Sequence, residues 1–425
     1  MQTPTRSTLA WLLQIAYTTA RLFTRNGMQN HAAATAFYFL LSATPLVLLM
    51  SYALQWLAHL AENSRPATIL MAALYAQLHL DALGALGFIP GKTRLTAGSV
   101  SFFTLLLSSR GLVTAVQNAF RVIFPDERRR GLVVSWTLPF VILPLLFLLI
   151  LLSALAQATL DFLAQNQLIG HANAALLGSL NGLLGFLVIG GLIFVAYWRL
   201  PERRPGARAA ALFALGATLS LIALFAVFRA FFKLENYNGI YGALGSVVFV
   251  LIGAYLAFLI FYVWAQALYA YGKSDVTALE KLFLASHGAG ATRLESYVFA
   301  DTNRLLEKYG RVFVAGETII REGDTTQTTY FLYAGRAAVY KDGPDGARRI
   351  GTLEEGELFG EMAYLLGEPR TASVIAETDV TVLELPPATF EELMRSSAPL
   401  ARRVVDVLCQ RLERMNLASA GQTGA

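Results

Sequence analysis

FGEMAYLLGEPRTASV, residues 359–374, is the most specific pattern in the C-terminal part of this sequence. A short helix that begins near Gly360 would point free backbone N–H groups at an anion. Gly360 also permits a close approach to the backbone. The planar guanidinium of Arg370 can grip two phosphate oxygens at once, and the carboxylate of Glu361 suits a sugar hydroxyl. One ligand with both groups would satisfy both side chains; the alternative is an internal Glu361–Arg370 ion pair.

The sequence on both sides of this stretch has the hydrophobic period of short strands. Turn signals, including Gly335, Asp342-Gly343 and Gly356, separate apolar runs that alternate with polar residues. These runs are TTYFLYAG, RAAVYKD, ARRIGTLEEG, TASVIAE and VTVLELP. Helical sequence follows from residue 389 onward. The pattern predicts an antiparallel β domain that ends in helices.

The stretch resembles the phosphate-binding cassette of cyclic nucleotide-binding domains, with the same spacing from Gly360-Glu361 to Pro369-Arg370-Thr371-Ala372. The flanks, such as residues 319–324 and 353–357, resemble that family too, and the resemblance covers about residues 297–417. It implies an eight-stranded β-roll with flanking helices, and a cyclic mononucleotide (cAMP or cGMP) as the regulatory ligand. The implied site residues are Gly360, Glu361, Met362, Ala363, Arg370, Thr371 and Ala372. Thr371 does not decide between cAMP and cGMP.

Composition separates this part from the rest of the chain. The 425 residues are 55% hydrophobic and only 15% charged, with a mean hydropathy of +0.51, whereas soluble domains carry about 25% charged residues. Residues 1–272 hold 17 Lys and Arg against 7 Asp and Glu, and residues 273–425 hold 17 against 22. These values exclude a plain soluble enzyme and a disordered chain. The basic charge lies in the loops of an apolar half, so no nucleic-acid partner is expected.

Residues 1–271 are predicted to form an all-α bundle that crosses the membrane six times, because a bilayer core needs ~20 mostly apolar residues per helix. The predicted spans are residues 33–57, 96–118, 133–156, 177–198, 209–228 and 243–268. Arg110 falls inside the second span, where it either lines a transport pathway or snorkels to the lipid headgroups. Residues 8–24 are predicted to be an amphipathic helix along the inner membrane surface or, equally, a short buried helix.

Loop charge predicts the orientation, since Lys and Arg near span ends favour the cytoplasmic side. Arginines gather in the N-terminal tail and in the loops after the second and fourth spans, while the loop after the third span has no Lys or Arg. With six spans, every Arg-rich loop falls on the same side. Both termini are therefore predicted to be cytoplasmic, in a multi-pass protein of the cell inner membrane.

Four segments of this half resemble the BrkB/YihY family of inner-membrane proteins in order and spacing. They are HAAATAFYFLLSATPLVLL (31–49), SSRGLVTAVQNAFR (108–121), WRLPERRPGARAA (198–210) and YNGIYGALGSVV (237–248). The resemblance covers most of residues 10–270 and implies six spans. The segment YVWAQALYAYGKSDV (262–276) departs from the acidic, Asn-containing ending of that family, so the resemblance implies nothing about the geometry of the exit into the next domain.

Some members of that family have carried the label ribonuclease BN, but the residues give this activity no support. Acid–base or metal-assisted cleavage needs paired titratable groups or a carboxylate cluster. The cytoplasmic acids Asp126, Glu127 and Glu202 lie among arginines. Cys409 is the only cysteine, and the five histidines have no metal-ligand spacing. The sequence predicts no catalytic residue, no metal and no enzyme.

The combined prediction is a membrane domain over residues 1–271, a cytoplasmic linker over 272–296 and a cyclic nucleotide-binding domain over 297–425. Nucleotide binding is expected to regulate the membrane domain, which we expect to act as a transporter or permease. A membrane-anchored sensor or scaffold without transport is the alternative, and a membrane ribonuclease is a weaker one. The expected partners are the lipid bilayer and the cyclic mononucleotide, and a homo-oligomer stays open.

Overall fold

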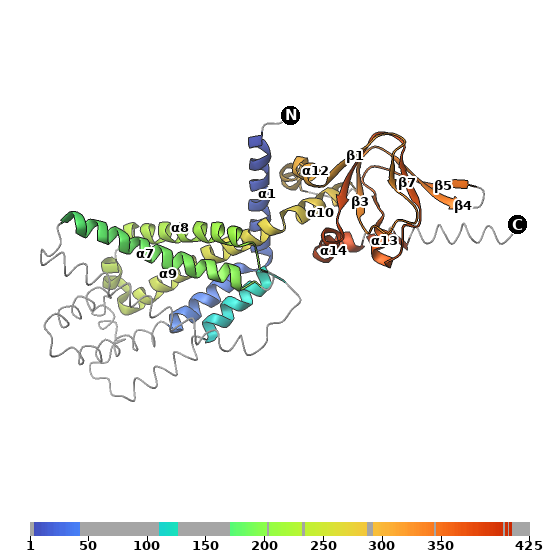
Figure 1. Cartoon of the computed structure of the whole chain (residues 1–425). Coiled ribbons are helices and arrows are strands. Elements are labelled where there is room, and N and C mark those ends of the chain that lie inside the picture. The colour runs from blue at the N-terminus through green and yellow to red at the C-terminus, as the bar shows by residue number, and fades with distance from the viewer. Residues whose placement is uncertain are drawn as a thin grey trace. The chain divides into compact units, whose positions relative to one another are not determined.

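The computed structural model describes residues 4–42, 110–125, 171–201, 204–231, 234–286, 292–343, 346–402, 404–406 and 408–409. The chain divides into two compact units. One comprises residues 18–270, and the other comprises residues 1–17 together with 271–425. Helices make up the described part of the first unit, and the second contains all the described strands (Figure 1).

The unit of residues 18–270 is built from long helices. They are helix 28–42, helix 110–123, α7 (His171–Arg199), α8 (Ala207–Phe231) and α9 (Leu234–Gly272), together with the second half of α1 (Pro4–Arg25). Apolar residues run along α8 and α9, and the segments Ala207–Phe228 and Val248–Gly272 each have a mean hydropathy of 2.4. Both segments are long and apolar enough to cross a membrane.

The described helices match the predicted spans in part. The predicted spans 209–228 and 243–268 lie in α8 and α9, and span 177–198 lies in α7, whose apolar stretch Gly185–Arg199 is shorter. Spans 33–57 and 96–118 are described only at one end, and span 133–156 lies outside the described residues. The structure therefore shows a helical region with two long apolar helices, and it does not show six spans.

Small residues let these helices approach closely. A Cβ atom added to Gly216 on α8 would lie 2.5 Å from the ring of Trp264 on α9. The indole N–H of Trp264 donates a hydrogen bond to Ser220 Oγ at 3.0 Å. The hydroxyls of Thr35 and Tyr262, both buried, are hydrogen-bonded at 2.7 Å. Gly216 and Ser220 thus serve helix packing, as is usual for small residues in membrane proteins.

We predict that Gly216→Ala destabilises this unit by about 1–3 kcal/mol, because overpacking forces Trp264 or the helix backbone to move. Gly191→Ala is the matched control, since nothing lies within 4 Å of a Cβ added to this glycine of α7. Thermal unfolding of the full chain in detergent measures both. A Gly216→Ala protein as stable as the Gly191→Ala protein would contradict the close contact.

The second unit begins with helices and continues with strands. Its helices are α10 (Ser274–Ser286), α11 (Arg293–Val298), α12 (Asn303–Tyr309), α13 (Glu361–Leu366) and α14 (Pro387–Ser396). Its strands are β1 (Gly310–Phe313), β2 (Thr318–Ile320), β3 (Thr329–Ala334), β4 (Ala337–Gly343), β5 (Gly346–Leu353), β6 (Leu358–Phe359), β7 (Ser373–Ala376) and β8 (Val380–Leu385).

The eight strands form two antiparallel sheets of four strands, ordered β1-β8-β3-β6 and β2-β7-β4-β5. Leu332 lies opposite Val382 in the first sheet, and Val339 lies opposite Val374 in the second. One buried cluster joins side chains of both sheets, including Leu332, Val382 and Val374. The expected antiparallel domain of eight strands is confirmed, because two four-stranded sheets pack face to face on this shared cluster.

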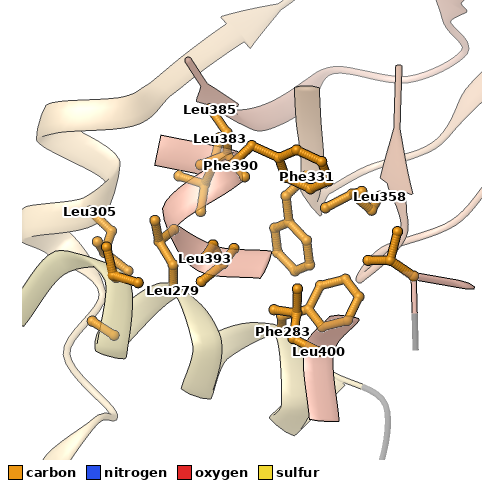
Figure 2. Close-up of a cluster of buried hydrophobic side chains, with 13 residues drawn as sticks. Leu279, Phe283, Leu305, Phe331, Leu358, Leu383, Leu385, Phe390, Leu393 and Leu400 are labelled. Carbon is orange, nitrogen blue, oxygen red and sulfur yellow. The ribbon is translucent and has the colours of Figure 1, made fainter. Parts of the chain in front are cut away.

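A second buried cluster joins the flanking helices to the first sheet (Figure 2). Leu279 and Phe283 of α10 pack with Phe331 of β3 and Leu358 of β6, and the ring centroids of Phe283 and Phe331 are 5.9 Å apart. The other residues labelled in Figure 2 belong to the same cluster. They are Leu305 of α12, Leu383 and Leu385 of β8, Phe390 and Leu393 of α14, and Leu400. Helix α10 lies in the segment expected as a linker, yet it supplies core side chains. The Gly-Ala-rich residues 287–291 lie outside the described residues.

Candidate functional site

The predicted cassette is the connection between β6 and β7. Gly360 follows β6 with φ +74°, a left-handed conformation that favours glycine, and α13 begins at the next residue. A Cβ atom at Gly360 would lie 2.6 Å from Nη1 of Arg370 and 3.0 Å from Cδ1 of Ile320. Backbone geometry and the close approach of Arg370 therefore both require glycine at this position.

Arg370 is almost completely buried, with 4% of its surface exposed. Its Nη1 donates to the carbonyl oxygen of Gly360 and its Nη2 to that of Thr328, both at 2.6 Å. Nε and Nη2 together donate to Thr326 Oγ1, each at 3.3 Å. The guanidinium is thus held by neutral oxygen atoms on three sides.

The main chain of Arg370 is tied to the same loop as its side chain. Its N–H donates to the carbonyl of Asp324 at 2.8 Å, and its carbonyl accepts from the N–H of Gly323 at 2.9 Å. The Ser373 hydroxyl accepts from the N–H of Glu322 at 2.9 Å. The loop between β2 and β3 therefore positions the cassette, which accounts for the family-like sequence of both segments.

Glu361 is the first residue of α13 and is 1% exposed. Burial lowers the pKa of the Arg370 guanidinium, and the negative charges of Asp324 and Glu361 oppose that shift. Within the described residues the hydrogen bonds of Arg370 end on neutral oxygens rather than on the Glu361 carboxylate. The alternative of a direct Glu361–Arg370 ion pair is therefore not what the structure shows.

The structure brings Gly360, Glu361 and Arg370 together, while the remaining predicted residues differ in exposure. Ala363 is buried, Met362 and Ala372 are half-buried, and Thr371 is exposed. The roles of Thr326 and Thr328, which lie more than forty positions before Arg370, were not predicted from the sequence. The run of threonine residues just before β3 was the only local signal for the Thr326 hydroxyl as an acceptor. The Thr328 acceptor is a main-chain carbonyl, which any residue would supply.

Two polar residues that fall in a predicted span of the other unit lie on helix 110–123. Arg110, at the start of helix 110–123, is exposed, and Gln117 in the same helix is buried.

Each of the two parts of the chain matches a known protein family. The sequence model of the cyclic nucleotide-binding domain matches residues 310–397. The model of the family described as virulence factor BrkB matches residues 19–281, which is more than half of the chain.

The curated relatives resemble only a small part of this chain. The cAMP-dependent protein kinase regulatory subunit of Aspergillus niger is 38% identical over 91 residues, which are 21% of this chain and 22% of the relative. A cyclic nucleotide-gated potassium channel of Rhizobium etli is 36% identical over 94 residues, 22% of this chain and 25% of the relative. The chain thus spans about a quarter or less of the length of these relatives.

Among solved structures, the catabolite activator protein of Thermus thermophilus is 28% identical. The match covers 28% of this chain and 56% of that chain, with a TM-score of 0.26.

We predict that Gly360→Ala destabilises the second unit more than Gly367→Ala does. Both glycines have positive φ, +74° and +69°, so both variants incur the left-handed penalty of about 1–2 kcal/mol. Only at Gly360 does the added Cβ meet Arg370 and Ile320, since nothing lies within 4 Å at Gly367. The expected difference is about 1–3 kcal/mol.

Differential scanning calorimetry of the full chain in detergent tests this expectation. The transition temperature should be lower for Gly360→Ala than for Gly367→Ala. Equal transition temperatures would mean that Arg370 does not lie against Gly360.

Proposed function

This chain belongs to the virulence factor BrkB family and carries a C-terminal cyclic nucleotide-binding domain, and we propose that cyclic nucleotide bound at Arg370 regulates its membrane domain. In this proposal the protein is a multi-pass protein of the inner membrane with both termini in the cytoplasm. It acts as a regulated transporter or permease and not as an enzyme. The bound ligand is cAMP or cGMP.

The buried guanidinium of Arg370 is the observation that supports an anionic ligand at this site. Among the described residues, carbonyl and hydroxyl oxygens accept the hydrogen bonds of this cation. Such acceptors offset its desolvation less than an anion would. A cyclic phosphate would supply the anion and accept two parallel hydrogen bonds from the guanidinium. Thr326 Oγ1 accepts from both Nε and Nη2, so it lies where one such phosphate oxygen would be gripped.

The packing around α10 supplies a route from the cassette to the membrane domain. Leu358 of β6 lies two residues before Gly360, and it shares a buried cluster with Phe283 of α10. Only Lys273 separates α10 from α9, and its ammonium group pairs with Glu392 on α14. A shift of the cassette would therefore reach α10 through packed side chains, and α9 through the backbone at Lys273. Such coupling requires that the nucleotide bind the two states with different affinities.

We predict that the full chain binds cAMP or cGMP with micromolar affinity, about −8 kcal/mol, and that Arg370→Ala weakens binding at least 100-fold. Arg370→Lys should lose at least tenfold, because an ammonium group keeps the charge without the planar fork. Arg348→Ala, which alters an exposed arginine on β5, is the matched control and should bind as the wild type does.

Isothermal titration calorimetry of the full chain in detergent measures all four proteins. The full chain is used because a fragment that begins after α10 would lack Leu279 and Phe283 of the core. Heats of binding that are the same for Arg370→Ala and the wild type would refute the assigned pocket.

We further predict that cyclic nucleotide changes solute flux through the membrane domain. Proteoliposomes loaded with potassium and chloride, with and without cAMP or cGMP, provide the measurement. The wild type should respond to nucleotide and Arg370→Ala should not, since its pocket cannot hold the phosphate. Nucleotide binding with no change in either flux would favour the anchored sensor over a regulated pathway for these ions.

A further inference from the structure

Helix α1 belongs to both units of the structure. It runs unbroken from Pro4 to Arg25, yet residues up to Tyr17 belong to the unit of residues 271–425 and residues from Thr18 to the unit of residues 18–270. A helix of this length is roughly 33 Å long. The chain therefore passes between its two units at α1 as well as at the end of α9.

Trp11 anchors the first half of α1. Its ring meets that of Tyr271 edge to face, with the centroids 5.5 Å apart. Its indole N–H donates to Ser274 Oγ at 3.4 Å. The guanidinium carbon of Arg304 lies 5.3 Å from the ring centroid on its face, a cation–π contact.

The residues around Trp11 are themselves fixed by charge. Arg304 pairs with the carboxylate of Asp275 and donates to Ser274 Oγ at 3.1 Å. Lys308 donates to the same carboxylate at 2.5 Å. Burial lowers the pKa of the Arg304 guanidinium. A partly desolvated cation strengthens its attraction to the indole ring.

Two more residues on the same side of α1 continue the contact. Gln14 is buried, and its Nε2 donates to the carbonyl of Val298 at the end of α11, at 3.2 Å. The ring of Tyr17 meets that of Phe299, with centroids 6.2 Å apart. Residues 11, 14 and 17 are three apart and so share one helix face. Leu12, beside Trp11 in sequence, is instead 56% exposed.

The surface that receives this face is connected to the nucleotide domain. We call it the α1 dock, and it comprises Tyr271, Ser274, Val298, Phe299 and Arg304. Arg304 lies on α12, whose next residue, Leu305, is buried in the cluster of Figure 2. Ser274 begins α10, which supplies Phe283 to the same cluster.

The second half of α1 is held within the other unit. Phe23 is buried. Asn26, directly after α1, donates to Gln266 Oε1 on α9 at 3.3 Å and to the carbonyl of Val122 at 3.5 Å. Each half of the helix is therefore packed along one side, while Leu9, Leu12 and Leu13 of its first half are exposed.

We propose that α1 is a second connection between the nucleotide domain and the membrane domain, and that its docking through Trp11 responds to cyclic nucleotide. With one connection the nucleotide domain could turn about Lys273 without moving the membrane helices. With a stiff helix fixed at both ends, movement of α10 and α12 reaches the membrane helices through α1 as well. The response to nucleotide rests on the proposed function, whereas the docking of α1 does not.

Hydrogen exchange of the full chain in detergent, followed by mass spectrometry, tests both parts. Without nucleotide, Trp11→Ala should raise the exchange rates of residues 8–17 at least fivefold, and Leu12→Ala should leave them unchanged. Arg304→Gln weakens the same contact from the dock side and should also raise them. If Trp11→Ala fails to fold, Arg304→Gln alone tests the docking. Unchanged exchange in Trp11→Ala or in Arg304→Gln would overturn the docking.

The nucleotide arm adds 1 mM cAMP or cGMP. In the wild type, exchange should change in residues 8–17 and in the cassette, and Arg370→Ala should abolish both changes. In Trp11→Ala the cassette should still respond while residues 8–17 do not. A cassette that responds in the wild type with no change in residues 8–17 would overturn α1 as a connection. A cassette that never responds would instead contradict the proposed function and leave the docking result standing.

Discussion

The structure of the C-terminal unit is organised around one buried positive charge. Arg370 is enclosed by the backbone of its own cassette and by the loop between β2 and β3, and oxygens without formal charge accept its hydrogen bonds. Gly360 must be glycine because a side chain would occupy the place of the guanidinium. A cation in this setting favours an anionic ligand, because the anion replaces weak dipoles with an opposite charge.

The same cassette is built into the hydrophobic core of the unit. Leu358 precedes Gly360 and packs with Phe331 and Phe283, so the strand that leads into the cassette and the helix that leads out of α9 share one cluster. Packed cores switch between discrete arrangements more readily than they deform. In the proposed function, a ligand at Arg370 would bias α10, the helix that follows α9 in the sequence.

The β-roll and the cassette could be predicted because their signals are local. Strand alternation and turn glycines repeat every few residues, and Gly360, Glu361 and Arg370 lie within one short stretch. Contacts between distant residues could not be predicted. Thr326 is hydrogen-bonded to Arg370, which lies 44 positions later in the sequence. Trp11 is hydrogen-bonded to Ser274, which lies 263 positions later. Helix α10 looked like a linker because its composition is polar, yet tertiary packing buries Leu279 and Phe283. Apolar composition identified α8 and α9 as long membrane-type helices, but it cannot specify which helices pack together.

A crystal structure of the full chain with bound cAMP would show whether Arg370 holds the cyclic phosphate. We expect a phosphate oxygen within hydrogen-bond distance of Nε and Nη2 of Arg370, in the place now taken by the Thr326 hydroxyl, with the ribose hydroxyl on Glu361. A nucleotide bound elsewhere, or a phosphate in the cassette while Arg370 keeps its bonds to Thr326, would contradict this expectation.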